Sequence, residues 1–391
     1  MFKKLKEIVV REFRNFKQNR TLMLILFGGP IVFPLVIGLV YIKAKPTDLP
    51  ITVVDLDNSS LSATIIDALD DSQYMRVYRV TSDEVQGHKD LQQSKVEGLI
   101  TIPYQFASMI QQKRHPEINI DLNSMNILTS NYINSAAVKT LGTINAGILM
   151  NTLQKTGMPA LSSAEQWEAF RVNTDKYYNP ETNYLRYLWP GVLATTLQQV
   201  FLMVIALMFS FEFEKNLFPE LLQKTKSASF MIFAKSLPYI LVMTVIWVIM
   251  LLTFFPLFKI PVAGSILSLT LFSILFFLSL LSLGLMVSVL CRTMVLSTDI
   301  LMIIATPSFI VAGYTWPVSQ MPGIIQGIAN AIPITPFLSG YRKILFMNYS
   351  LMDVLPEIKH LAILIVVFGL MGWTVLKLKI RYYLKKEKVV L

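Results

Sequence analysis

The residue types that perform catalysis in other proteins are present in this chain, but none has the spacing that catalysis requires. The three histidines, His88, His115 and His360, lie far apart, without the short spacings of a metal site. No Gly-x-x-x-x-Gly-Lys-[Ser/Thr] phosphate loop and no dinucleotide-binding glycine fingerprint occurs in the 391 residues. We therefore expect a chain that is not an enzyme and that holds no metal and no cofactor of its own.

One serine pair lies close to carboxylates and deserves separate consideration. Ser59 and Ser60 follow Asp55 and Asp57 at short distance. Serine catalysis would require a positioned base and an oxyanion site, and neither can be recognised here. The same residues directly follow a β-branched run, where they are typical caps of a helix. We predict a capping role.

Four charged residues lie at the edges of apolar segments in the C-terminal half: Glu212, Glu214, Arg292 and Asp299. Ionisable groups within a membrane are functional candidates by default. Their position at the segment ends, where water can reach them, predicts solvated boundary residues instead. A proton relay through the membrane centre is disfavoured, because no charge occupies the middle of the third, fourth or sixth apolar segment.

The hydrophobic pattern predicts the fold class. Hydrophobic residues make up 53% of the chain and charged residues only 15%, against about 25% in soluble domains. Segments long enough to cross a bilayer lie at 22–42, 191–211, 237–258, 265–290, 297–313 and 361–378. We predict an α-helical polytopic membrane protein with six transmembrane helices and an inserted α/β extracytoplasmic domain.

The positive charge predicts orientation rather than nucleic-acid binding. The formal net charge is +10, and basic residues concentrate before the first apolar segment and around the end of the last. The positive-inside rule then places both termini in the cytoplasm. The first segment is expected to stay as an anchor, because it is longer than the apolar region of a cleaved signal peptide.

The expected domains follow from these segments. They are a cytoplasmic amphipathic helix at 1–20, the first transmembrane helix at 21–43, the α/β domain at 44–188, and the remaining transmembrane helices at 189–391, with a cytoplasmic coupling loop at 212–235 and an outer-face re-entrant segment at 313–345. Strands expected at 51–54, 75–80, 96–102 and 118–122 alternate with helices, which is typical of an α/β domain. Along the first helix, an apolar stripe is expected from Phe2, Leu5, Val9, Phe13 and Phe16.

Several short motifs, taken in order, resemble one family. They are Val53-Val54-Asp55-Leu56-Asp57-Asn58-Ser59, Gly98–Phe106, Tyr178-Asn179-Pro180 followed by Trp189-Pro190-Gly191, and Gly313-Tyr314-Thr315-Trp316-Pro317 with Met321-Pro322. This order resembles the type-2 ABC exporter permeases, in the subfamily with a large external domain between the first two membrane helices. The resemblance implies a bacterial plasma (inner) membrane location.

The resemblance also implies roles for particular residues. The loop keeps Glu220, Leu222, Thr225 and Lys235 of the family's coupling pattern, and departs from it at Leu217, Phe218 and Lys226. Coupling to an ATPase is implied for Glu212, Glu214, Glu220, Leu221, Leu222, Lys224, Thr225 and Lys235, and an outer-face gate for Gly313, Tyr314, Trp316, Pro317, Met321 and Pro322.

The implied function is the permease subunit of an ATP-driven exporter of an amphipathic or lipid-like compound. Its implied partners are separate ATPase subunits that bind ATP and Mg²⁺, a second permease in a homodimer or heterodimer, membrane lipid and an extracytoplasmic adaptor. Two alternatives stay open: a membrane-anchored receptor or scaffold that acts through the external domain without transport, and an integral-membrane hydrolase.

Overall fold

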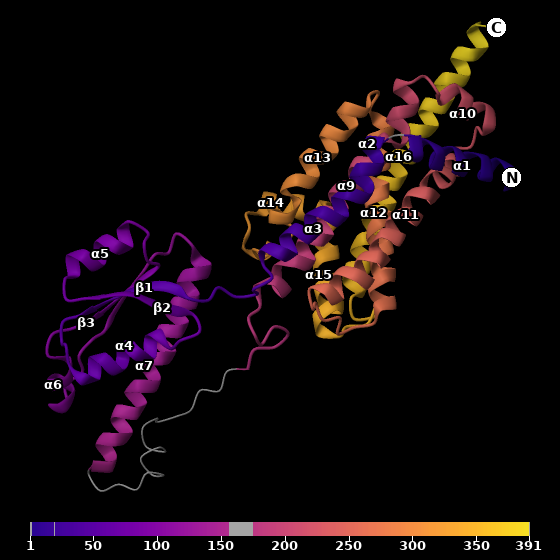
Figure 1. Cartoon of the computed structure of the whole chain (residues 1–391). Helices are drawn as coiled ribbons and strands as arrows, with labels where there is room; N and C mark the ends of the chain where they lie inside the picture. Colours follow the sequence, from indigo (N-terminus) through magenta and orange to yellow (C-terminus); the bar gives the residue numbers. More distant parts are fainter. Residues whose placement is uncertain (1, 19, 156–174, 391) are drawn as a thin grey trace. The chain divides into compact units, whose positions relative to one another are not determined.

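The computed structural model describes residues 2–18, 20–155 and 175–390. The chain forms two compact units (Figure 1). One comprises Lys45–Asp175, and the other comprises Met1–Ala44 together with Lys176–Leu391. Each unit has its own hydrophobic core, so the two are treated separately.

The smaller unit is an α/β domain around a four-stranded sheet. The strands are β1 (Leu49–Asp55), β2 (Met75–Thr81), β3 (Gly98–Ile102) and β4 (Asn119–Leu122), in the order β2-β1-β3-β4. β1 is parallel to β2 and to β3, whereas β4 is antiparallel to β3. Parallel neighbours require a crossover connection, which α4 (Ser60–Asp70) and α5 (Glu84–Gln92) supply. The predicted α/β region is confirmed.

Both faces of the sheet are covered by helices. One face of the sheet packs its buried Val53 and Ile100 with residues of α4 and of α7 (Ile127–Lys155), including Ile65 and Ile133. On the other face α5 approaches closely, because a Cβ at Gly87 would lie 2.7 Å from Val54 and 2.9 Å from Leu99. The short α6 (Phe106–Gln111) adds Phe106 to the core.

The turn after β1 is built on a buried aspartate. Asp55 Oδ1 accepts hydrogen bonds from the backbone N–H groups of Asp57 and Asn58, each at 3.0 Å, and Oδ2 accepts one from the Ser62 hydroxyl at 2.7 Å. Ser59 and Ser62 form a reciprocal capping box at the start of α4. The predicted capping role of Ser59 is confirmed, and Asp55 holds the turn in place.

The larger unit is helical. Its elements are α1 (Phe2–Gln18), α2 (Arg20–Met23), the π-helical η1 (Leu24–Gly28), α3 (Gly29–Val40), α9 (Tyr184–Glu214), α10 (Phe218–Lys224), α11 (Ala228–Leu257), α12 (Ile266–Leu290), α13 (Met294–Val311), the 3₁₀ turn η2 (Val318–Gln320), α14 (Gly323–Ala331), α15 (Ile334–Met347) and α16 (Leu355–Val390). Within the described residues, five helices are long and apolar enough to cross a membrane: α9, α11, α12, α13 and α16. These helices make the chain a multi-pass membrane protein.

The first apolar segment is helical but irregular. The irregularity is at η1, whose wider π-helical hydrogen-bond pattern ends at Gly28, directly before α3 begins at Gly29. Its apolar stretch, Leu24–Val40, is shorter than the five long helices. The structure therefore supports five spanning helices directly, while a sixth rests on the continuity of α2, η1 and α3.

The membrane helix that follows the α/β domain begins earlier on the chain than predicted. The α/β domain was expected to end at residue 188, and a membrane helix was expected to begin around Pro190. Instead, α9 begins at Tyr184, capped by the Asn183 side chain, and contains Pro190. The Tyr184 N–H also donates to the Ala44 carbonyl at 2.8 Å, which ties this stretch to the end of the first span.

Helix α9 occupies the centre of the helical unit, with α1 and α10 at one end and α15 at the other (Figure 1). It is the most buried of the spanning helices. Gly284 of α12 lets that helix approach Ile205, and the Gln198 amide donates to the Ser308 hydroxyl of α13 at 2.6 Å. Movement of α9 must therefore be transmitted to its neighbours, since close-packed interiors do not deform freely.

Replacement of Asp55 by alanine should loosen the α/β unit locally. Three donors, the N–H groups of Asp57 and Asn58 and the Ser62 hydroxyl, lose an acceptor, which costs about 1–3 kcal/mol. Hydrogen-exchange mass spectrometry on the full chain should show faster exchange across 56–62. Asp71→Ala, at an exposed carboxylate, is the control and should leave the exchange unchanged. Equal exchange in the two variants would contradict this role of Asp55.

Candidate functional site: a charge cluster beside the predicted coupling helix

The predicted coupling loop contains one short helix, α10. Pro219 lies in its first turn, as expected for a helix start. Pro219, Glu220 and Gln223 are exposed, whereas Lys224 and Thr225 are half-exposed. These residues form the surface of α10 that a second protein can contact.

The apolar side of α10 faces its own unit. Leu221 is fully buried and Leu222 nearly so, so they pack against the rest of the helical unit, and their implied role in coupling to an ATPase stays a prediction. They hold the helix in place, together with Phe218, whose ring lies 4.9 Å from Phe213 and 5.2 Å from Tyr383. Burying these side chains is what fixes a seven-residue helix that would not form alone.

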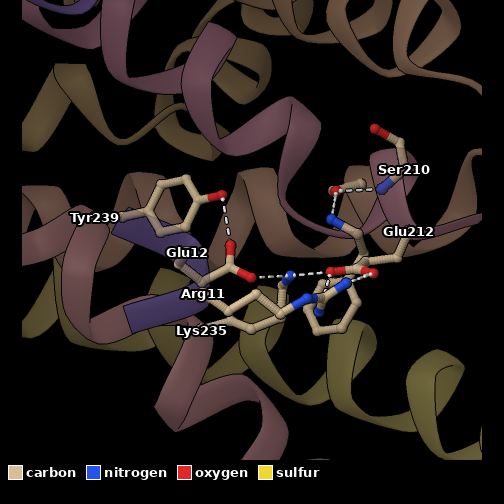
Figure 2. Close-up of polar contacts among 8 residues, drawn as sticks. Arg11, Glu12, Ser210, Glu212, Lys235 and Tyr239 are labelled. Carbon is tan, nitrogen blue, oxygen red and sulfur yellow. Dashed lines mark hydrogen bonds and ion pairs between the residues drawn. The ribbon is translucent and has the colours of Figure 1, made fainter. Parts of the chain in front are cut away.

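Immediately before α10 in the sequence, the end of α9 carries a buried cluster of charges (Figure 2). Lys235 Nζ of α11 donates to Glu212 Oε1 of α9 and to Glu12 Oε1 of α1, each at 2.7 Å. Arg11 of α1 donates to both oxygens of Glu212, each at 2.8 Å. The Tyr239 hydroxyl donates to Glu12 Oε2 at 3.4 Å. The cluster connects three helices, α1, α9 and α11.

The charges of the cluster balance. Two carboxylates face one ammonium and one guanidinium, and Glu12, Glu212 and Lys235 are each at most 2% exposed. Burial alone would lower the pKa of Arg11, but the hydrogen bonds and charge of Glu212, with the charge of Glu12, raise it overall. Arg11 therefore stays charged and keeps Glu212 paired. Removing a single member of such a cluster is strongly destabilising, because it leaves a buried charge without a partner.

One sequence prediction needs correction here. Glu212 was expected to be a solvated boundary residue, but it is buried and paired with Lys235, because α1 covers the end of α9 and excludes water. Coupling of Lys235 to an ATPase stays a prediction. Glu12 and Arg11 were not identified from the sequence. The available signal was an acidic residue at position 12, four residues from Ile8 and from Phe16.

The buried side of α1 also differs from the predicted stripe. Ile8 and Phe16 are buried, with Glu12 between them, whereas Phe2 and Phe13 are exposed at 85% and 39%. The apolar residues of α1 recur with the 3.6-residue period of a helix, as predicted. The face of α1 that packs against the unit, however, is the one that carries Glu12. Phe16 packs edge-on against Tyr239 at 4.8 Å.

Glu214 and the other boundary charges have separate roles. Glu214 Oε2 accepts a hydrogen bond from the Met294 N–H at 2.7 Å, at the first residue of α13. A carboxylate at a helix N-terminus is favoured by the helix dipole. Arg292 and Asp299 are exposed, as predicted. Glu214 thus joins α9 to α13 beside the cluster.

The predicted gate residues lie at the opposite end of α9. Tyr314 is buried, and its hydroxyl donates to the Tyr187 carbonyl at 2.5 Å, while the Tyr187 hydroxyl donates to the Tyr314 carbonyl at 3.1 Å. Gly191 leaves room for the Tyr314 ring, since a Cβ there would lie 2.6 Å from it. Gly313 has a φ of +81°, which favours glycine.

The remaining predicted gate residues differ from Tyr314 in their exposure. Trp316 is 59% exposed, Pro317 and Pro322 are exposed, and Met321 is half-exposed. The segment 313–345 is broken into η2, α14 and α15, none of which is long enough to span a membrane. The sequence placed Tyr314 in the site but missed its partners Tyr187 and Arg342.

A family model described as "ABC-2 family transporter protein" matches residues 20–374. The chain belongs to this family. The resemblance to type-2 ABC permeases is thereby confirmed, and the family places this chain with the membrane permeases rather than with the ATPases.

Two curated relatives from Escherichia coli strain K12 agree with the family. The chain is 24% identical over 258 residues to the probable multidrug ABC transporter permease YbhS. The matched region covers 65% of each protein. It is 26% identical over 175 residues to the probable multidrug ABC transporter permease YbhR, covering 45% of this chain and 48% of that protein. The chain thus spans about two thirds or less of the relatives it matches.

Removing Lys235 should destabilise the helical unit of this ABC-2 family protein. Lys235→Met leaves the buried Glu12 without a cation beside the remaining Arg11–Glu212 pair, at a cost of about 3–5 kcal/mol. Adding Glu12→Gln should restore part of that loss, because the remaining Arg11–Glu212 pair is again neutral. The unfolding temperature of each purified variant in detergent measures the loss of stability and its partial restoration. Lys215→Met, at an exposed lysine, is the control. A single variant as stable as this control would contradict the prediction.

Gly191→Ala should disturb the tyrosine contact at the other end of α9. The added methyl group overlaps the Tyr314 ring, and overpacking of this kind costs about 1–3 kcal/mol. Gly327→Ala in α14 is the matched control, since nothing lies within 4 Å of a Cβ there. The unfolding temperature should fall for Gly191→Ala and stay equal or rise for Gly327→Ala. A lower unfolding temperature for Gly327→Ala than for Gly191→Ala would refute the close approach of the Tyr314 ring to Gly191.

Proposed function

We propose that this chain is the permease subunit of an ATP-driven ABC exporter, and that α10 receives the movement of a separate ATPase. The observation that carries the proposal is the charge cluster Arg11, Glu12, Glu212 and Lys235. It joins three helices at the point where α10 follows α9. ATP and Mg²⁺ are bound by the ATPase subunits.

The connection between α10 and the cluster is short. The Leu217 N–H, directly before α10, donates to the Glu212 carbonyl at 2.9 Å. Glu212 itself holds Arg11 and Lys235 through its side chain. A push on the exposed side of α10 therefore reaches α9 within one helical turn.

The cluster makes the three helices respond together. Separating any one charge from its partners leaves an uncompensated buried ion, which costs about 3–5 kcal/mol. Moving α1, α9 and α11 as one body avoids this cost. Because α9 is 31 residues long, about 46 Å, the same movement arrives at Tyr187 and Gly191 near the opposite end. The segment 313–345 then acts as an outer gate.

The membrane arrangement in this proposal has six spans. Residues 20–40 form a helical stretch of about 30 Å, which matches the hydrocarbon core. Both termini then lie in the cytoplasm of a bacterial plasma membrane, with α1 at its inner surface. A homodimer or a heterodimer with a similar permease would form the transport path, and the α/β unit would contact an extracytoplasmic adaptor.

The proposed substrate is an amphipathic or lipid-like compound that leaves the cytoplasm or the inner leaflet. A cavity of about 470 Å³ adjoins the charge cluster, and its lining includes the polar Glu12, Lys235 and Tyr239 and the apolar Phe16, Leu207 and Phe211. A lining that combines polar and apolar side chains suits such a molecule. The names of the two relatives, which include the word multidrug, agree with this class.

Charge reversal at Glu220 should detach the ATPase. Glu220 is exposed on α10 and is not part of the buried cluster. The tagged chain is purified from native membranes, and the ATPase activity that co-elutes is measured. Glu220→Lys should lower the co-eluting activity about tenfold or more, because a like charge across an interface costs several kcal/mol.

The control applies the same substitution elsewhere. Glu117→Lys, at an exposed residue of the α/β unit, should co-elute with as much ATPase activity as the unaltered chain. An unaltered chain that elutes without any ATPase would overturn the exporter proposal and favour the receptor or scaffold. Full retention by Glu220→Lys would instead refute only the assigned docking face.

A further inference from the structure

The segment between α13 and α16, together with the start of α16, lines a cavity of about 620 Å³ whose polar lining is incompletely paired. We propose that it binds the headgroup of an anionic phosphodiester amphiphile that also carries hydroxyl groups. This inference goes beyond the proposed function, because it concerns binding by the chain alone and needs no ATPase.

Arg342 supplies the charge that would recognise a phosphate. Its guanidinium lies 4.8 Å from the ring of Tyr314 and 5.8 Å from that of Tyr187. Its guanidinium donates a long hydrogen bond, 3.4 Å, to the Tyr314 carbonyl. Among the residues that the structure describes, no carboxylate pairs with Arg342. The planar guanidinium is thus held by aromatic rings while most of its donors stay available for a phosphate.

The other charges of the cavity leave an excess of one positive charge. Lys343 Nζ is bonded to Glu357 Oε1 at 2.6 Å, so this pair is neutral. Arg342 is then uncompensated. A ligand with a single negative charge balances the cavity, as a phosphodiester does.

Two buried oxygens indicate that the ligand also carries donors. Within the described part of the chain, Glu357 Oε2 and Thr335 Oγ1 have no hydrogen-bond partner, although both residues line the cavity and are 8% and 9% exposed. Buried polar atoms are nearly always paired. Hydroxyl groups on the headgroup would satisfy both oxygens, which a bare phosphodiester would not.

The size and the apolar part of the lining favour an amphiphile over a free anion. Ligand cavities commonly measure about 300–1,000 Å³, far more than an inorganic phosphate fills. Val318, Leu338 and Met347 also line the cavity, and they offer contact to the glycerol backbone or the beginning of an acyl chain. The cavity lies in the broken helices of 313–345, where irregular backbone at membrane depth is expected to line a cavity.

Calorimetric titration of the purified full chain in a maltoside detergent tests the proposal. The probes are dihexanoyl phosphatidylglycerol, dihexanoyl phosphatidylcholine and inorganic phosphate. Phosphatidylglycerol should bind about tenfold or more tightly than either of the others, because only it combines one negative charge, hydroxyl groups and an apolar body. Equal binding of phosphatidylcholine would overturn the charge argument, and equal binding of inorganic phosphate would overturn the amphiphile.

Substitution of Arg342 then locates the site. Arg342→Gln should weaken phosphatidylglycerol binding about tenfold or more, and Arg342→Lys should retain an intermediate affinity, because lysine keeps the charge but not the fork of donors. Arg292→Gln, at an exposed arginine outside the cavity, should bind as the unaltered chain does. Unchanged binding by Arg342→Gln would refute the site. If that variant does not fold, the lipid selectivity of the unaltered chain still decides the proposal.

Discussion

The organisation of the helical unit depends on four charges that pair with one another, three of which, Glu12, Glu212 and Lys235, are removed from water. A buried ion is costly unless its partners are in place. Glu212 meets this condition only when α1 brings Arg11 and α11 brings Lys235 to it, and Lys235 in turn requires Glu12. The cluster therefore fixes where the N-terminal helix packs, and with it the entrance to the first apolar segment.

Helix α9 connects this cluster to the opposite end of the helical unit. At one end it carries Glu212 and Glu214, which connect it to α1, α11 and α13. At its other end Tyr187 and Gly191 enclose Tyr314. Between these ends the helix is packed on several sides, so it cannot bend without disturbing its neighbours. An event at α10 and an event at the 313–345 segment are thus mechanically related through one element.

The sequence predicted local structure well and packing poorly. Ser59 as a cap and the four strands of the α/β unit both follow from nearest-neighbour effects, and the structure contains them. The clearest error concerns burial. Glu212 was expected to be solvated because it lies at the end of an apolar segment, and that position does not reveal which helix will cover it.

The sequence by itself determined that this chain crosses a membrane several times, that it carries an α/β insertion, and that it belongs with type-2 ABC permeases, because apolar length, strand alternation and short ordered motifs are local properties. The tertiary structure alone decided that Glu12 and Arg11 belong to the same site as Glu212 and Lys235. More than two hundred positions separate Glu12 from Lys235. Ion pairing at such a separation depends on which helix faces meet, and that is set by the packing of the whole unit.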